Sequence, residues 1–169
     1  DGAEVQWVLN TTERFWLDKR KNTTNNHTCL SWQKKGLGGR DKITYTFDET
    51  YFNGTTQITN TLSGTLDMIN TWDSTGAVLN VTGVSEEGEN ISYLLVHWNR
   101  TYHCAMFYTQ TLLPNGTRTN QTCGLYYWNL AVDNQTSRNH CETLYKHYCD
   151  PYGEDQILYN ISCKTYPAC

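Results

Sequence analysis

The segment Cys123–Cys163 constrains the fold most strongly, because it carries four of the seven cysteines of this 169-residue chain. Residues 125–128 are aromatic and aliphatic and predict a strand. Asn139 is a potential helix cap, and apolar side chains recur from Cys141 at intervals of three and four residues, which predicts one buried helix face. Alternation over residues 157–161 predicts a final short strand. We therefore expect a sheet with one late helix tied to it by disulfides.

Eleven N-x-S/T sequons indicate the compartment in which this chain folds. With 16 Asn and 32 Ser or Thr in the chain, chance would give only about three. The seven cysteines agree, since disulfides form in oxidising surroundings. We predict a secreted, extracellular glycoprotein with disulfide bonds, and a start at Asp1 without Met fits a mature secreted product. The predicted glycosylation sites are Asn10, Asn22, Asn26, Asn53, Asn80, Asn90, Asn99, Asn115, Asn120, Asn134 and Asn160.

Composition argues against several classes of function. A net charge of −4 does not suit a nucleic-acid partner, and no apolar run is long enough for membrane insertion. The histidines have no spacing typical of metal ligands, and no serine lies in a nucleophile motif. Glu86, Glu87 and Glu89 are expected in solvent at a hairpin tip rather than as an acid–base pair. The sequence predicts a single domain over residues 1–169 that is not an enzyme and needs no metal or cofactor.

The rest of the chain reads as short strands separated by turns. The clearest alternation runs from Ile43 to Phe47, and Asn53-Gly54 and Pro114-Asn115-Gly116 are turn signals. About eight antiparallel strands precede the helix, without βαβ alternation, which is typical of a sandwich or an up-and-down barrel. The late helix favours an all-β, eight-stranded antiparallel up-and-down barrel with a C-terminal α-helix. An immunoglobulin-like sandwich is the alternative, but it has no place for that helix.

The sequons also predict which side chains face inward, because a glycosylated Asn must face solvent. If Asn80 and Asn90 face outward, their strand neighbours face the interior. The inward sets are then aromatic and aliphatic, with almost no charge, as in a small-molecule site. Each of these side chains could equally be plain core packing, since a closed barrel also needs filler. The predicted ligand-lining residues are Trp16, Tyr45, Phe47, Leu79, Tyr93, Leu95, His97, Phe107, Tyr126 and Trp128.

The cysteine spacing, with Trp7 upstream, the C-G-L-Y-Y strand and the run NLAVDNQTSRNHC, resembles the tick salivary lipocalins of the histamine-binding-protein group. The resemblance covers roughly residues 7–163. It implies a lipocalin barrel with a central pocket, secreted in saliva. It also implies the disulfide pairs Cys29–Cys163, Cys104–Cys141 and Cys123–Cys149, with Cys169 left over. Sequence alone leaves open whether Cys163 and Cys169 exchange roles, and whether Cys169 is free, capped or intermolecular.

Matching to the amine-binding relatives predicts a different ligand class. Their interior carboxylates fall here on Arg20, Leu95 and Gly124, so a protonated amine such as histamine or serotonin would lack its anion. The resemblance then favours sequestration of a hydrophobic host mediator, a sterol such as cholesterol or an eicosanoid such as a leukotriene. An eicosanoid would need a cation near the mouth, for which Arg14, Arg20 and Arg40 are candidates.

A second function is open on the same resemblance. Relatives act on complement or immune cells through their outer surface, with or without a cargo. Residues 32–42 form the longest sequon-free basic segment, with Lys34, Lys35, Arg40 and Lys42. This segment predicts a surface for a host immune protein or cell, although a solvated loop would have the same composition.

Overall fold

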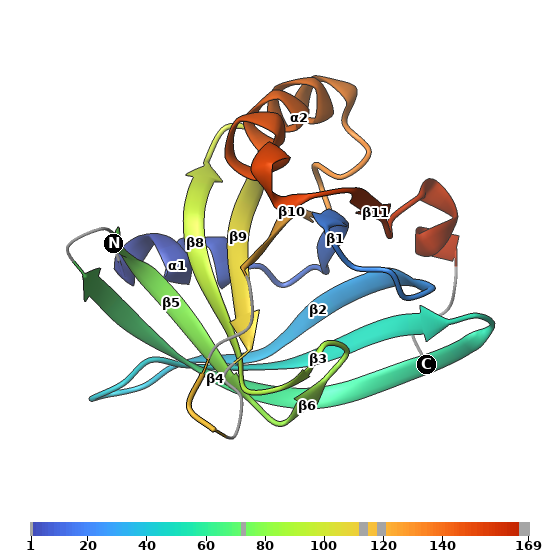
Figure 1. Cartoon of the computed structure of the whole chain (residues 1–169). Coiled ribbons are helices and arrows are strands. Elements are labelled where there is room, and N and C mark those ends of the chain that lie inside the picture. Colours follow the sequence, from blue (N-terminus) through green and yellow to red (C-terminus); the bar gives the residue numbers. More distant parts are fainter. Residues whose placement is uncertain (1, 72–73, 112–114, 118–120, 166–169) are drawn as a thin grey trace.

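Eight antiparallel strands form a closed barrel in the computed structural model, which describes residues 2–71, 74–111, 115–117 and 121–165 (Figure 1). The order around the barrel is β10-β9-β8-β5-β4-β3-β2-β1, and β10 pairs with β1 to close it. The predicted all-β barrel with a C-terminal helix is confirmed. The barrel strands are β1 (Phe15–Lys21), β2 (His27–Gly38), β3 (Thr44–Asn53), β4 (Thr56–Thr71), β5 (Ser74–Thr82), β8 (Ile91–Asn99), β9 (Cys104–Thr111) and β10 (Thr122–Trp128).

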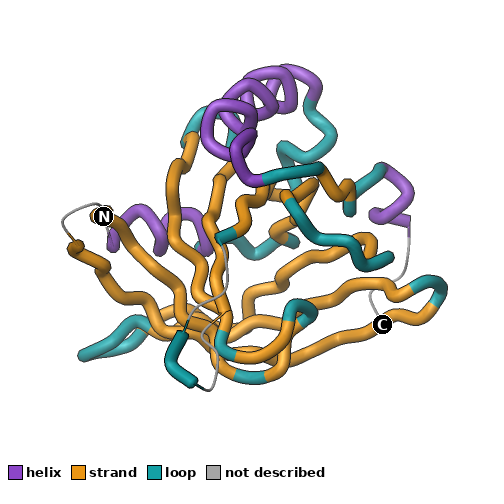
Figure 2. The backbone as a smooth tube through the Cα atoms, in the orientation of Figure 1, coloured by secondary structure: helices purple, strands orange, loops and turns teal. Residues whose placement is uncertain are grey.

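Smaller elements cover the barrel. Helix α1 (Gly2–Leu9) packs on β5, β4 and β8, and its Val8 and Leu9 are fully buried. The hairpin β6 (Val84–Ser85) and β7 (Gly88–Glu89) interrupts the connection from β5 to β8. Helix α2 (Gln135–Cys149) lies on the outer side of β9 and β10 (Figure 2). The chain ends through η1 (Asp150–Tyr152), the edge strand β11 (Asp155–Ile157) beside β1, and η2 (Ile161–Thr165).

Two local expectations for the C-terminal segment were wrong. Helix α2 begins at Gln135, because the side-chain oxygen of Asn134, not Asn139, accepts the Ser137 backbone N–H at 3.0 Å. The final strand stops at Ile157, and residues 161–165 form a 3₁₀ helix. The alternation over 157–161 misled because Leu158 and Tyr159 both donate their backbone N–H to the Asp18 carbonyl, which turns the chain away from the sheet.

The barrel wall separates two hydrophobic clusters. The inner cluster is enclosed by the strands and consists of Val8, Leu9, Phe15, Leu17, Leu30, Trp32, Tyr45, Phe47, Tyr51, Leu62, Ala77, Leu79, Val81, Ile91, Tyr93, Leu95, Ala105, Phe107, Tyr126 and Leu158. The outer cluster lies between the wall and the C-terminal segment and consists of Trp16, Cys29, Cys104, Met106, Cys123, Leu125, Tyr127, Ala131, Val132, Cys141, Tyr145, Cys149, Tyr159 and Cys163. Strict alternation along β9 and β10 assigns neighbouring residues to opposite clusters.

Three disulfides join Cys29 to Cys163, Cys104 to Cys141 and Cys123 to Cys149, and all of them lie in the outer cluster. These are the pairs implied by the resemblance. Two of them attach α2 to β9 and β10, and the third attaches η2 to β2. The exchange of Cys163 with Cys169 is excluded by the first pair, while Cys169 itself lies outside the described residues.

Candidate functional site

Aromatic rings fill the interior of the barrel. Trp32 lies at the centre, with ring centroids 4.7 Å from Phe47, 5.0 Å from Tyr93 and 5.7 Å from Tyr126. Phe15 stacks on Tyr126 at 5.3 Å. Such tilted and edge-on pairs add to the free energy gained by burying the rings. Trp32 was not among the predicted ligand-lining residues, although its alternation with Leu30 could have indicated it.

Most of the predicted ligand-lining residues lie on this inner side. Tyr45, Phe47, Leu79, Tyr93, Leu95, Phe107 and Tyr126 belong to the inner cluster, and Trp128 packs against it. The exception on β1 is Trp16, which faces outward because Phe15 and Leu17 take the inward positions. Its indole N–H donates to Asn129 Oδ1 at 2.8 Å, and its ring lies 5.1 Å from Tyr159.

His97 is the second exception, and its cause is a β-bulge. The register between β8 and β9 shifts between Leu95 and His97, which moves His97 to the outer side, where its ring stacks on Tyr148 of α2 at 5.4 Å. Trp98 takes the inward position instead and packs against the inner cluster, with its ring 5.4 Å from Trp128. The buried indole N–H of Trp98 has no hydrogen-bond partner among the described residues. A sequence pattern of strict alternation could not reveal this shift.

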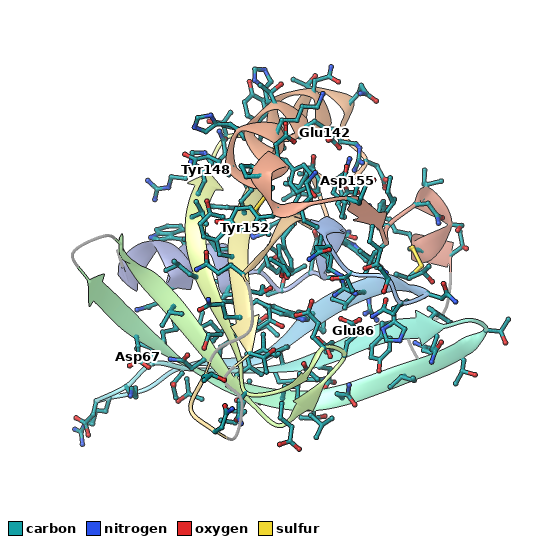
Figure 3. The ribbon with its side chains drawn as sticks, viewed as in Figure 1. Asp67, Glu86, Glu142, Tyr148, Tyr152 and Asp155 are labelled. Carbon is teal, nitrogen blue, oxygen red and sulfur yellow. A yellow bond between two sulfur atoms is a disulfide. The ribbon has the colours of Figure 1, made fainter. Side chains whose placement is uncertain are left out.

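The hairpin β6–β7 closes one end of the barrel with charged side chains, contrary to expectation. Glu86 is not in solvent: its side chain is 1% exposed and makes a two-pronged ion pair with Arg20, at 2.7 and 2.8 Å. His27 Nδ1 lies 2.6 Å from the same carboxylate, and Asn25 Nδ2 donates to it at 3.0 Å. Figure 3 shows Glu86 beside the strands that the hairpin covers. We call Arg20, Asn25, His27, Glu49, Glu86 and Glu87 the mouth cluster.

The mouth cluster places carboxylates against the aromatic interior. Glu49 is 1% exposed; it accepts the Glu86 backbone N–H at 2.8 Å and the Trp32 indole N–H at 3.2 Å. Glu87 Oε1 accepts from Arg20 Nη1 at 2.9 Å. The expectation of an interior with almost no charge was therefore wrong. Strand alternation could have predicted Glu49, which shares a face with Phe47 and Tyr51, but nothing local predicts that a hairpin tip folds back over the barrel.

These carboxyl groups have different proton affinities. Burial works to raise the pKa of Glu86, but the hydrogen bonds and charge of Arg20, with help from His27, lower it overall. Burial raises the pKa of Glu87 to about 7 despite the opposing charge of Arg20. Burial also raises the pKa of Glu49, against the hydrogen bonds from Glu86 and Trp32. The mouth cluster therefore contains one firmly ionised carboxylate and two that hold protons more readily than usual.

Outside this charged layer lies an open mouth pocket of about 260 Å³, lined by Thr23, Asn25, Glu86, Glu87, Thr109, Gln110, Thr111 and Thr122. Inside it lie the rings of Tyr93 and Tyr126, whose phenol pKa values are raised well above normal by burial and then by the charge of Glu87. At the opposite end, the Trp128 indole N–H donates to the Val8 carbonyl at 2.8 Å, so that α1 closes the barrel there. The mouth cluster is thus the layer between solvent and the aromatic interior.

The three arginines predicted as candidate cations lie in three different surroundings, and most of the predicted glycosylation sites are exposed. Arg20 lies at the mouth but is fully engaged, Arg14 lies on the outer side of the wall, and Arg40 is exposed between β2 and β3. The sequon asparagines within the described ranges are exposed except Asn80 and Asn99, which are half-buried. Asn120 lies outside the described residues.

Within the described ranges, no group of three or more His, Cys, Asp or Glu side chains is arranged to hold a metal ion. None of the helices in that part of the chain is both long and apolar enough to cross a membrane.

The closed eight-stranded barrel with its C-terminal helix is the lipocalin fold. The structure is similar to that of the siderocalin Ex-FABP, with a TM-score of 0.57 and 13% identity over 96% of this chain and 97% of that one. It is also similar to lobster apocrustacyanin A1, at TM-score 0.53 and 10% identity over 94% and 82%, and to apocrustacyanin C1, at 0.51 and 12% over 98% and 92%. No protein-family profile and no curated protein sequence matches the chain.

Proposed function

We propose that this protein is a secreted, non-enzymatic carrier that sequesters one small hydrophobic molecule within its barrel. The observation that carries the proposal is the layered site: an aromatic interior lies beneath a charged mouth and contains an indole N–H for which the described residues provide no hydrogen-bond partner. An apolar lining with a few placed polar groups is the usual composition of a small-molecule site. The lipocalin fold, three disulfides and mostly exposed sequons support an extracellular carrier.

The resemblance to tick salivary lipocalins gives this carrier a setting. In that setting the protein lowers the free level of a host lipid mediator at a feeding site and so modulates inflammation or immunity. Affinity and abundance suffice for this, and no chemical step is required. The ligand must displace or rotate rings around Trp32, because these rings now contact one another.

The charges at the mouth favour a neutral lipid. The guanidinium of Arg20 is taken up by Glu86 and Glu87, so it offers no free cation for the carboxylate of an eicosanoid. A sterol such as cholesterol has only a hydroxyl to satisfy, which the Trp98 indole N–H or a tyrosine can do. We therefore place a sterol ahead of a leukotriene-like fatty acid.

A protonated amine of the histamine or serotonin type is the second candidate for the barrel. Three carboxylates, those of Glu49, Glu86 and Glu87, lie near one guanidinium and one imidazole, so the cluster can supply an anion that sequence matching did not find. A buried ammonium group needs such an anion. This observation favours amine binding more than the sequence does.

The test is native mass spectrometry of glycosylated protein with cholesterol, a leukotriene, histamine and serotonin, each at pH 6 and pH 8. A neutral sterol should bind equally at both pH values and equally to Glu87→Gln. An amine should bind better at pH 8, where Glu87 is ionised, and should bind less well to Glu87→Gln. If none of the four binds to protein whose disulfides are intact, the carrier function is wrong.

An immunomodulator that acts through its outer surface is the remaining alternative. The basic segment of residues 32–42 is not one loop, because residues 32–38 belong to β2 and only residues 39–43 connect it to β3. It is also less positive than its sequence suggests, because Lys35 pairs with Asp48 at 3.3 Å and Lys42 with Asp67 at 3.1 Å. Arg40 and the exposed ends of these pairs could still meet an acidic partner. A serum pull-down with wild type and with Arg40→Ala would support this alternative if a single partner is lost in the variant.

A further inference from the structure

A second cavity lies on the outer side of the barrel wall and shares no lining residue with the mouth pocket. Its volume is about 370 Å³, which is within the range of small-molecule sites. It is bounded by β1, β2, the β3–β4 hairpin and η2, and the Cys29–Cys163 disulfide forms part of its surface. The lining residues are Glu13, Arg14, Trp16, Cys29, Ser31, Thr50, Phe52, Gln57, Asn129, Cys163 and Lys164. We call this cavity the outer pocket.

The outer pocket combines a mixed polar and apolar lining with a guanidinium that forms no ion pair within the described part of the chain. The aromatic members of its lining are the half-buried Phe52 and Trp16, which is 3% exposed. Arg14 donates from Nη1 to Ser31 Oγ at 2.7 Å, and its guanidinium lies 6.0 Å from the Trp16 ring centroid. Among the described residues Arg14 has no ion-pair partner. Partial burial lowers its pKa, against the distant charge of Asp48, so the guanidinium is desolvated without full compensation.

The other charged groups of the outer pocket do not neutralise Arg14. Lys164 is occupied, since its Nζ lies 2.8 Å from Asp133 Oδ2 and donates to the Asn129 carbonyl at 3.1 Å. Glu13 is exposed and forms no ion pair with Arg14. A guanidinium held in place by Ser31 presents a fixed fork of donors, which suits a carboxylate.

A hydrogen bond and a disulfide fix the lining of the outer pocket, and its described lining contains no sequon asparagine. The Trp16 indole N–H is fixed by Asn129 Oδ1, and the disulfide ties η2 to β2. Asn129, the one asparagine in the described lining, does not begin a sequon, because it is followed by Leu130 and Ala131. A glycan attached to the lining itself therefore cannot fill it.

From this geometry we propose that the outer pocket is a second binding site, for a small organic carboxylate with a flat apolar body. The carboxylate lies on Arg14, and the apolar body lies against Trp16 and Phe52. The site is independent of the barrel interior, because the wall formed by β1 and β2 separates the two. It extends the proposed function from one ligand to two chemically different ones.

The test uses 2-naphthylacetate as the anionic probe and 2-naphthaleneethanol as its uncharged analogue. Binding is followed by the tryptophan indole N–H resonances of ¹⁵N-labelled protein, and titration gives the affinity. The anion should shift the Trp16 resonance and leave those of Trp32 and Trp98 in place. Arg14→Gln should weaken binding of the anion about tenfold or more, as expected for a lost charge-assisted pair. The alcohol should bind more weakly and respond little to Arg14→Gln.

Arg100→Gln is the matched control. Arg100 also lies over a tryptophan, 4.9 Å from the Trp7 ring centroid, but it does not line the outer pocket. This variant should bind both probes as wild type does. Arg14→Lys, which keeps the charge and loses the fork, gives a second measure if Arg14→Gln folds poorly, and should be intermediate. The proposal is overturned if the anion shifts Trp32 and not Trp16, if the alcohol binds as tightly as the anion, or if folded Arg14→Gln binds like wild type.

Discussion

The two sides of one barrel wall are stabilised by different means. The outer cluster contains all three disulfides. Ion pairs lie around it, with Arg138 Nη2 3.0 Å from Asp18 Oδ1 and Lys19 Nζ 2.6 Å from Glu142 Oε1. The inner cluster has no disulfide among its members, and its mouth is closed by non-covalent contacts of one hairpin. The comparison indicates that the outer side fixes the fold, whereas the inner side can rearrange around a ligand at its mouth.

The strongest test of this division removes a covalent link. Replacing Cys29 and Cys163 with Ala opens a bridge that spans 134 residues, and should lower the free energy of unfolding by about 4–5 kcal/mol, because the unfolded chain gains loop entropy. The Cys104–Cys141 bridge spans 37 residues, so its removal should cost about 1 kcal/mol less. Denaturant unfolding followed by tryptophan fluorescence measures both.

Cys169→Ser alters none of the three bridges and is the control for replacing a cysteine as such. The folded fraction of each double variant should still bind the barrel ligand with wild-type affinity. A loss of that affinity without loss of stability would show that the outer bridges shape the interior. It would contradict the claim that the two sides of the wall have separate roles.

Adjacent residues on β9 give a sharper comparison. Phe107 and Met106 are both 0% exposed, but Phe107 faces the inner cluster and Met106 the outer. Phe107→Ala should cost about 3–5 kcal/mol and Met106→Ala about 2–5 kcal/mol, through lost burial and the cavity left behind. Thermal unfolding with and without cholesterol then separates their roles. The ligand should stabilise Met106→Ala as much as wild type, and should stabilise Phe107→Ala to a different extent. Equal stabilisation of all three would place the ligand elsewhere.

The sequence predicts those features of the barrel wall that are encoded by local patterns along the chain. The strands, their turns and the late helix are encoded locally, by alternation and by Asn-Gly and Pro signals, so the barrel could be predicted. The disulfide pairs came from the resemblance and not from geometry. Seven of the ligand-lining predictions fell on the inner cluster, because regular strands keep the period of two.

The failures arose where that period is broken or where distant segments meet. A bulge moved His97 outward and Trp98 inward. The prediction that Trp16 lines the interior is wrong because Phe15 and Leu17 occupy that face. The prediction that Glu86 lies at a solvated tip is wrong because its partners Arg20 and His27 lie 66 and 59 residues away in sequence. No local pattern carries such a contact.

The pH dependence of hairpin closure tests whether the mouth is the end of the barrel that can open. Burial in the closed hairpin raises the pKa of Glu87 from 4.5 to about 7. Its carboxyl group therefore stabilises the closed hairpin most strongly below pH 4.5. This stabilisation is lost as the pH rises through about 7. The lowered pKa of Glu86 has the opposite sign: its contribution is present above its usual value and is lost in acid. The hairpin should therefore be most firmly closed between about pH 5 and 6.

Hydrogen exchange of the amides of residues 84–89, corrected for intrinsic rates, should show opening favoured at pH 8 over pH 6 by about 1–2 kcal/mol. Glu87→Gln should abolish most of this difference. Glu142→Gln, on the outer side, should retain it, because Glu142 pairs with Lys19 and does not contact the hairpin. A difference that persists in Glu87→Gln would assign the effect to another group, with Glu49, whose pKa burial also raises, the first to examine.

The smallest expected effect concerns Asn134, which is both a sequon asparagine and the cap of α2. Its Oδ1 accepts the Ser137 N–H, while a glycan would be attached to Nδ2, so capping and glycosylation are compatible. Asn134→Ala should cost about 1 kcal/mol, whereas Asn134→Asp should keep the cap and lose the sequon. Thr136→Ala, which also removes the sequon, separates the glycan from the cap. All three should leave binding in the barrel unchanged, because α2 lies on the outer side of the wall. A change in ligand affinity from any of them would mean that the helix communicates with the interior through β9 and β10.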